Sequence, residues 1–387
     1  MSMTDGIRKR LGAFLRRRGG QNAPEHPRAT LTAPEGALDP AQGKATCVIV
    51  VGPSFNQAVP TAMMTFRQGY ADAFESLEIP YLFLDQHDLC DVLPGLPNPF
   101  CMVNGSDFVY MDQPALRMLR RHSHCVWVDP WFGDSDRFFA SHGLNAAIWH
   151  WSPEHRKRIL DSGPAFVHTA TVPGGLGFFA EWERHGMKVV SLPLACDLSL
   201  YARDEAEEPT FQGVKLAFVG GYWESKGKQL DDYLRPYEDD LAIYGYSPWP
   251  YRGYRGMLDR AAEPVLYRQA LLSPVINEPS VAILKGQINE RIFKVLGAGG
   301  VPLVDAVPAY RELFSPDELL IPADVGEFHE LVRKHLSGDD TLVRLGRKGR
   351  EAVLSRHTYR HRAEQLLAAL GLQGEMTCSK ENPHGTA

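Results

Sequence analysis

The sequence predicts an α/β protein with two domains, each built around a mostly parallel sheet. Three observations carry this prediction. Short apolar runs of strand length alternate with helical segments along most of the chain. A polar stretch at residues 204–210 interrupts this pattern once, after which the pattern starts again. The length of 387 residues also suits two domains, because a single hydrophobic core rarely serves a chain of that size.

Composition excludes several classes of protein. Hydrophobic residues make up 44% and charged residues 23% of the chain, which is ordinary for a globular protein with a sizeable core. The net charge of −6 argues against a nucleic-acid partner, because no basic field steers the chain onto phosphates. No apolar run reaches the roughly 18 residues that a membrane helix needs. Six cysteines without a C-x-x-C pair and the lack of a signal-peptide pattern predict a cytoplasmic location.

The two ends of the chain differ from the rest. Residues 1–44 form a basic arm and a linker, and residues 372–387 are polar and predicted to be disordered. Within the arm, residues 7–18 place four large apolar side chains at helical spacing among six basic ones. Two interpretations stay open, a solvated arm or a short helix that contacts anionic lipid peripherally at the inner face of the membrane.

The first domain is predicted to span residues 45–203. A continuous β-branched run at 46–51 is typical of a buried parallel strand, and a helix is expected at 58–77. Further strands are expected at the apolar runs 79–84, 108–111, 125–128, 146–149, 166–169 and 188–192.

The second domain is predicted to span residues 204–371, with strands at 214–219, 240–244, 274–276 and 301–304 and helices at 327–336, 340–354 and 360–370. The first of these strands ends in Gly220 and Gly221, and Lys226 follows. In doubly wound sheets, phosphates bind at glycine-rich turns beyond the carboxyl ends of strands. These residues are therefore candidate phosphate ligands, although a glycine pair is equally typical of a plain tight turn. The absence of G-x-G-x-x-G disfavours a nicotinamide cofactor.

A second constellation lies at residues 286–305. Asn289 is a candidate N-cap for a helix of about two turns, and Gly299 and Gly300 follow the helix. Glu290 in the first turn would accept hydrogen bonds from sugar hydroxyls, while Arg291 and the helix N-terminus face an anion. The alternative is that Glu290 and Lys294 form an exposed i,i+4 ion pair and the glycines only close the helix.

The segments 289–305, 307–314 and 356–362 resemble the CgeB/YkvP-like glycosyltransferases, a group within the GT-B, group 1 class. The shared pattern is an R-x-F helix, an apolar strand, a P-x-x-x-x-x-F stretch and a late H-T-Y-x-x-R. The resemblance covers the second domain well. In the first domain it rests on residues 126–130 and 191–197, which are similar to the D-x-P and L-P-x-A-x-D segments of the family.

The resemblance implies two Rossmann-like domains facing a central cleft. The first would hold the acceptor and any general base, and the second would bind a nucleotide-sugar through Gly220, Gly221 and Lys226. Asp129 follows an apolar strand and matches the D-x-P position, so it is a candidate catalytic base. His168 is the other candidate, with suitable chemistry but no motif, and the alternative for it is a satisfied core histidine.

Lys294 stands where the family has a glutamate that is expected to bind the donor ribose. Glu290, one turn earlier, can take that role, Lys294 can neutralise phosphate, or catalysis has been lost. No D-x-D lies between apolar flanks, so no metal and no cofactor besides the donor is expected. The resemblance implies sugar transfer from a nucleoside-diphosphate sugar to a hydroxyl of a surface glycan, lipid-linked saccharide or protein. The alternatives are a catalytically silent nucleotide-binding or scaffold protein in polysaccharide assembly, or a nucleotide-sugar epimerase.

Overall fold

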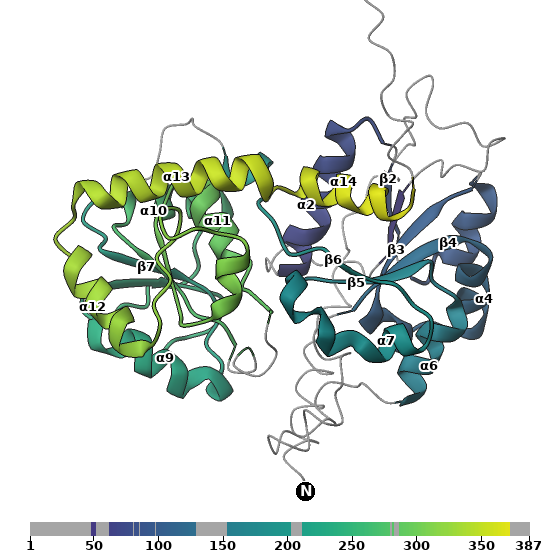
Figure 1. Ribbon diagram of the computed structural model, residues 1–387, viewed down its shortest axis with the longest axis horizontal. Helices are drawn as coiled ribbons and strands as arrows, with labels where there is room; N and C mark the ends of the chain where they lie inside the picture. The colour runs from purple at the N-terminus through teal and green to yellow at the C-terminus, as the bar shows by residue number, and fades with distance from the viewer. Residues whose placement is uncertain are drawn as a thin grey trace, which may run out of the picture.

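The computed structural model describes residues 48–51, 62–79, 81–84, 86–96, 98–128, 153–202, 211–278, 281 and 286–371. These residues form two α/β lobes that lie side by side (Figure 1). Several predicted features lie outside the described residues: the basic arm and linker at 1–44, Asp129, the strand at 146–149, the polar stretch at 204–210 and the tail at 372–387. Among the helices that are described, none is long and apolar enough to cross a membrane.

The first lobe contains a six-stranded parallel sheet in the order β2-β1-β3-β4-β5-β6. Its strands are β1 (Val48–Val51), β2 (Tyr81–Leu84), β3 (Phe100–Asn104), β4 (Ser123–Trp127), β5 (Phe166–Thr169) and β6 (Val189–Ser191). The helices of this lobe are α2 (Ala62–Ser76), α3 (Leu89–Val92), α4 (Gln113–Arg121), α6 (Pro153–Ser162), α7 (Ala180–Arg184) and α8 (Leu198–Tyr201).

One predicted strand of this lobe is wrong. Residues 108–111 do not form a strand, because residues Gly105–Val109 are a 3-10 helix and the strand is β3, at Phe100–Asn104. Phe108 is fully buried, which explains the apolar pattern. The Asn104 side chain accepts a hydrogen bond from the Ser106 amide at 2.9 Å, and this contact ends the strand and starts the tight turn.

The second lobe contains the parallel pairs β7 (Leu216–Val219) with β8 (Leu241–Tyr244) and β9 (Ser273–Val275) with β10 (Pro302–Val304). A parallel bridge between Leu216 and Leu272 joins the pairs, so the strand order is β8-β7-β9-β10. After β7 the chain adds β8 on one side of β7, and it then adds β9 and β10 on the other side. The order of strands therefore reverses between β7 and β9. Ligands of open α/β sheets bind at such a switch point, beyond the carboxyl ends of the strands.

Helices cover both faces of the second sheet. They are α9 (Gly227–Leu234), α10 (Glu263–Gln269), α11 (Arg291–Gly297), α12 (Val325–His335) and α13 (Asp340–Arg356). Phe218 and Ile243 pack on one face with Leu230 of α9 and Phe328 of α12. On the opposite face, α10 packs on the sheet. Helix α11 lies between α10 and α13, on the side that faces the first lobe (Figure 1).

The last helix, α14 (Tyr359–Ala369), crosses back to the first lobe. It continues from α13 over the first lobe in Figure 1 and packs against α2. The Tyr359 ring lies 5.3 Å from the Tyr70 ring, and a Cβ at position 69 would overlap Tyr359, so only glycine fits there. The predicted range 204–371 for the second domain therefore includes a helix that belongs to the core of the first lobe.

Two chain segments cross between the lobes. The Cys196 amide donates to the carbonyl of His357 at 2.8 Å, and the Tyr359 amide donates to the carbonyl of Cys196 at 3.2 Å. Arg362 reinforces the crossing, because its Nε donates to the carbonyl of Pro193 at 2.6 Å. Both passages from one lobe to the other are thus joined by hydrogen bonds at one place.

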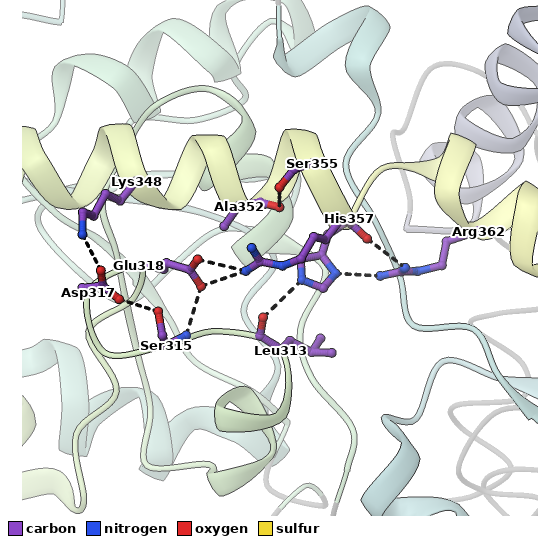
Figure 2. Close-up of polar contacts among 10 residues, drawn as sticks. Leu313, Ser315, Asp317, Glu318, Lys348, Ala352, Ser355, His357 and Arg362 are labelled. Atoms are coloured by element: carbon purple, nitrogen blue, oxygen red, sulfur yellow. Dashed lines mark hydrogen bonds and ion pairs between the residues drawn. The ribbon is translucent and has the colours of Figure 1, made fainter.

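His357 lies at the centre of this crossing. Figure 2 shows its ring between Arg362, which donates to Nδ1 at 3.1 Å, and the carbonyl of Leu313, which lies 3.2 Å from Nε2. Because Nδ1 accepts, the proton of the neutral ring is on Nε2. Beside it, Arg356 makes a two-oxygen contact with Glu318. Burial, reinforced by the neighbouring Arg362 charge, lowers the pKa of His357 to about 4.

This environment predicts acid sensitivity. The pKa of His357 falls from 6.5 to about 4 on folding, so the unfolded chain binds the proton more readily and stability falls as pH drops through this interval. Between pH 7 and pH 5, His357 should account for a loss of roughly 1–2 kcal/mol in the free energy of unfolding. In urea denaturation, H357Q should show a smaller loss over this interval than the unsubstituted protein. Equal losses in the two proteins would contradict the assignment.

Candidate active site

The structure brings several predicted residues together around one cavity of about 170 Å³. The cavity lies at the carboxyl ends of β7 and β8, beside the start of α11. Its lining residues are Tyr201, Val219, Gly220, Gly245, Tyr246, Met257, Leu258, Arg260, Glu263, Asn289, Glu290, Arg291 and Lys294. Gly220, Asn289, Glu290, Arg291 and Lys294 were predicted from sequence, and the other lining residues were not.

Arg291 is the most constrained side chain of the cavity. Its Nε donates to the carbonyl of Val219 at 2.7 Å, and its Cζ lies 4.3 Å from the centre of the Phe218 ring. A Cβ on Gly220 would lie 2.5 Å from Nη2, so the glycine turn and the guanidinium fit each other. Nη1 is buried and has no hydrogen-bond partner. The cavity therefore contains a fixed cation with one donor group left to bind a ligand.

The start of α11 supplies the other polar groups. The N-cap of α11 is Glu290 and not Asn289 as predicted, because the helix starts at Arg291, one residue later than expected. Asn289 Oδ1 still accepts a hydrogen bond from the Arg291 amide at 2.9 Å. Lys294 Nζ lies 2.5 Å from Glu290 Oε1, and both side chains are largely buried, at 14% and 13% exposure. The pair is therefore not the exposed surface pair of the alternative interpretation. Oε2 of Glu290 is buried and unpartnered.

Neighbouring carboxylates hold Lys294 in its charged form. Burial alone would lower the pKa of Lys294, but the carboxylates of Glu290 and Glu263 outweigh burial and raise the pKa. Glu263 is itself fixed, because it accepts hydrogen bonds from Tyr201 at 3.0 Å and from Tyr267 at 2.9 Å. Tyr201 ends α8, so one wall of the cavity comes from the segment that leaves the first lobe.

Lys226 lies near the cavity but does not line it. Its Nζ donates to the carbonyl of Ile276 at 2.9 Å and to Glu278 at 3.0 Å, and the residue is 4% exposed. Burial lowers its pKa, and Glu278 opposes this effect. The contact places Lys226 across the switch point, between the carboxyl ends of β7 and β9. Asp305 lies behind it, bonded to Asn277, and burial raises its pKa to about 6.

The remaining predicted glycines have different surroundings. Gly221 follows Gly220 and lies beneath the rings of Tyr246 and Trp223. Gly299 and Gly300 lie beyond the opposite end of α11, where Gly299 has φ of +85° and a Cβ on Gly300 would overlap the carbonyl of Tyr267. These two glycines allow the turn from α11 into β10, and the structure does not bring them to the cavity.

Of the two candidate catalytic bases, only His168 falls in the described part of the first lobe. Asp129 lies outside the described residues. His168 is 1% exposed on β5, and neither ring nitrogen has a hydrogen-bond partner. Burial lowers its pKa to about 3, so the ring is neutral at physiological pH. His168 does not line the cavity described above, and its catalytic role stays a prediction.

In the part of the chain that the structure describes, no group of three or more His, Cys, Asp or Glu side chains is arranged to hold a metal ion.

The fit between Gly220 and Arg291 predicts the effect of one added methyl group. G220A should displace the guanidinium, and the dissociation constant for inorganic pyrophosphate should rise about tenfold. Isothermal titration calorimetry measures this constant. G177A is the matched control, because a Cβ at position 177 meets nothing within 4 Å. Unchanged pyrophosphate binding by G220A would show that Arg291 is not an anion ligand.

Comparison with known proteins agrees with this geometry. The glycosyl transferase-like family model matches residues 225–368, which is less than half of the chain. A sequence search of curated proteins gives no match.

Several solved structures share the whole architecture. Sucrose-phosphate synthase from Thermosynechococcus elongatus has a TM-score of 0.56 and 11% identity, covering 84% of this chain and 98% of its own. HepE from Anabaena, in complex with UDP and glucose, has a TM-score of 0.54 and 10% identity, covering 84% and 99%. The DNA-modifying enzyme β-glucosyltransferase has a TM-score of 0.53 and 10% identity, covering 84% and 100%. The predicted fold is confirmed: the chain has the GT-B fold, and its residues 225–368 are similar to the glycosyl transferase-like family.

Proposed function

We propose that the protein transfers a sugar from a nucleoside-diphosphate sugar to a hydroxyl group of an acceptor. One observation carries the proposal. Arg291 Nη1 and Glu290 Oε2 are buried groups of opposite charge without partners, and both residues line one cavity beside the glycine turn of a GT-B fold. A diphosphate satisfies the first group and a sugar hydroxyl satisfies the second. The complex of HepE with UDP and glucose supports the same ligand class for this fold.

Different residues of the site would bind different parts of the donor. Arg291 binds the diphosphate next to Gly220 and Gly221, and Lys226 joins it by exchanging the Glu278 carboxylate for a phosphate oxygen. Glu290 accepts hydrogen bonds from the ribose hydroxyls. Lys294 lies 2.5 Å from Glu290 and keeps that carboxylate oriented. Lys294 is therefore a positioning residue, and its presence in place of the family glutamate is compatible with activity.

The transfer itself needs a base and a stabilised leaving group. A base in the first lobe, for which Asp129 is the proposed residue and His168 the second candidate, accepts the proton of the acceptor hydroxyl. The acceptor oxygen forms a bond to the anomeric carbon while the bond to the diphosphate breaks. Arg291 and Lys226 balance the charge that develops on the departing nucleoside diphosphate. We propose that the reaction uses no metal and no cofactor besides the donor.

The finer assignments are proposals as well. The R-x-F helix at Arg291, the P-x-x-x-x-x-F stretch and the His357-Thr358-Tyr359 segment support a CgeB/YkvP-like enzyme. The acceptor class is a surface glycan, a lipid-linked saccharide or a protein, and the location is cytoplasmic.

A donor screen tests the proposed function. In thermal-shift assays, one or more of the UDP-, GDP-, dTDP-, ADP- and CMP-sugars should raise the melting temperature, because a ligand that binds only the folded state stabilises it. The same donor should be hydrolysed slowly, with or without EDTA. E290A should weaken donor binding about tenfold, as expected for the loss of a charged hydrogen-bond acceptor.

The control for the screen is E364A, since Glu364 pairs with Arg360 on the surface of α14, away from the cavity. Absence of stabilisation by all donors would refute the proposed function. Stabilisation without hydrolysis or transfer would instead favour a silent nucleotide-binding protein.

A peripheral membrane contact through residues 7–18 remains a separate proposal, based on their six basic and four large apolar side chains. Each basic residue near an anionic surface contributes about 1 kcal/mol, so the arm should bind vesicles that contain phosphatidylserine. In vesicle sedimentation, the full chain should bind such vesicles, and a chain lacking residues 1–18 should not. Equal sedimentation of both proteins would exclude a role for the arm.

A further inference from the structure

The mouth of the cavity carries an exposed rim of large apolar side chains, formed by the aromatic residues Trp223 and Tyr246 and by Met257. Their exposed fractions are 47%, 44% and 60%, whereas most large apolar side chains among the described residues are buried. Tyr246 and Met257 line the cavity, and the Trp223 ring lies 5.8 Å from the Tyr246 ring. Exposed apolar side chains that gather beside a cavity indicate a binding surface.

The rim lies directly above the glycine turn. A Cβ on Gly221 would be 3.0 Å from the Tyr246 hydroxyl and 3.2 Å from Trp223 Cζ2, so both rings pack over this residue. Burial and the nearby Glu278 carboxylate raise the pKa of Tyr246. The rim is thus within reach of any ligand whose phosphates bind at Gly220 and Arg291.

The fold itself does not need these side chains for its core. The loop that follows β8 contributes its buried aromatic packing through Trp249 and Tyr251, which are 6% and 4% exposed. Trp249 also fixes the turn, because its Nε1 donates to the carbonyl of Gly220 at 2.9 Å. Tyr246, three residues before Trp249, points to the cavity instead. Its exposure is therefore not a requirement of local packing.

We propose that the rim of Trp223, Tyr246 and Met257 binds the nucleobase of the donor by stacking. This inference rests on the proposed function. A nucleoside diphosphate is charged at one end and aromatic at the other. The cavity offers a matching group for each end, with Arg291 for the diphosphate and the rim for the base. Stacking recognises the flat face that all bases share. The rim therefore contributes affinity for every nucleotide and little discrimination among bases.

The test measures separately how much the base and the diphosphate contribute to binding. Isothermal titration calorimetry with the full chain would compare UDP, ADP and inorganic pyrophosphate as ligands. The unsubstituted protein should bind both nucleotides more tightly than pyrophosphate. Y246A should raise the dissociation constants for UDP and ADP about tenfold or more, leaving pyrophosphate binding unchanged, whereas Y246F should retain nucleotide binding. W223A should have a smaller effect of the same kind.

Y110A is the matched control, because Tyr110 is 63% exposed in the first lobe and does not line the cavity. Its dissociation constants should equal those of the unsubstituted protein. Two results would overturn the inference while leaving the proposed function intact: nucleotide binding unaffected by both Y246A and W223A, or an increase only in the KM of the acceptor, which would assign the rim to the acceptor. If the unsubstituted protein binds neither UDP nor ADP, the inference fails together with the proposed function.

Discussion

The candidate donor site depends on how Arg291 is held. Its guanidinium is fixed by the carbonyl of Val219, by the face of Phe218 and by the missing side chain of Gly220. These contacts join the start of α11 to the end of β7. The guanidinium of Arg291 is therefore held by a segment that is distant from it in the sequence. A cation fixed before its ligand arrives loses little conformational entropy on binding. Because α11 has only seven residues, this side chain, rather than a helix dipole, supplies the positive charge.

The same cavity is connected to the junction of the lobes. Tyr201 ends the short helix that leaves the first lobe, and its hydroxyl donates to Glu263, whose carboxylate helps to keep Lys294 charged. A few residues before Tyr201, Cys196 is hydrogen-bonded to the segment at His357 and Tyr359. A change in the relative position of the lobes would therefore alter the wall of the cavity. The bond between the Gly174 amide and Glu312, at 2.8 Å, and that from the Val172 amide to the carbonyl of Gly286, also at 2.8 Å, add further contacts between the lobes.

Sequence patterns predicted most of the described strands, with β3 as an exception, and part of the site. Periodicity predicted the two α/β units, and the residues after 219 and around 290 were found because a glycine turn and a capped helix are local features. Tyr246, Met257 and Glu263 were missed, because they reach the cavity only through the strand order β8-β7-β9, which no local pattern encodes. The predicted strand at 240–244, which is followed by Gly245, was a partial signal for Tyr246, because ligands bind beyond the carboxyl ends of strands. The burial of Lys226 and the return of α14 to the first lobe also depend on long-range packing.

A crystal structure with a bound nucleoside diphosphate tests the central claim most directly. The diphosphate should lie between the turn at Gly220 and the guanidinium of Arg291, with a ribose hydroxyl at Glu290. Lys226 should then contact a phosphate oxygen in place of Glu278. A nucleotide bound elsewhere, with Arg291 Nη1 and Glu290 Oε2 still unpartnered, would contradict the assignment of this cavity as the donor site.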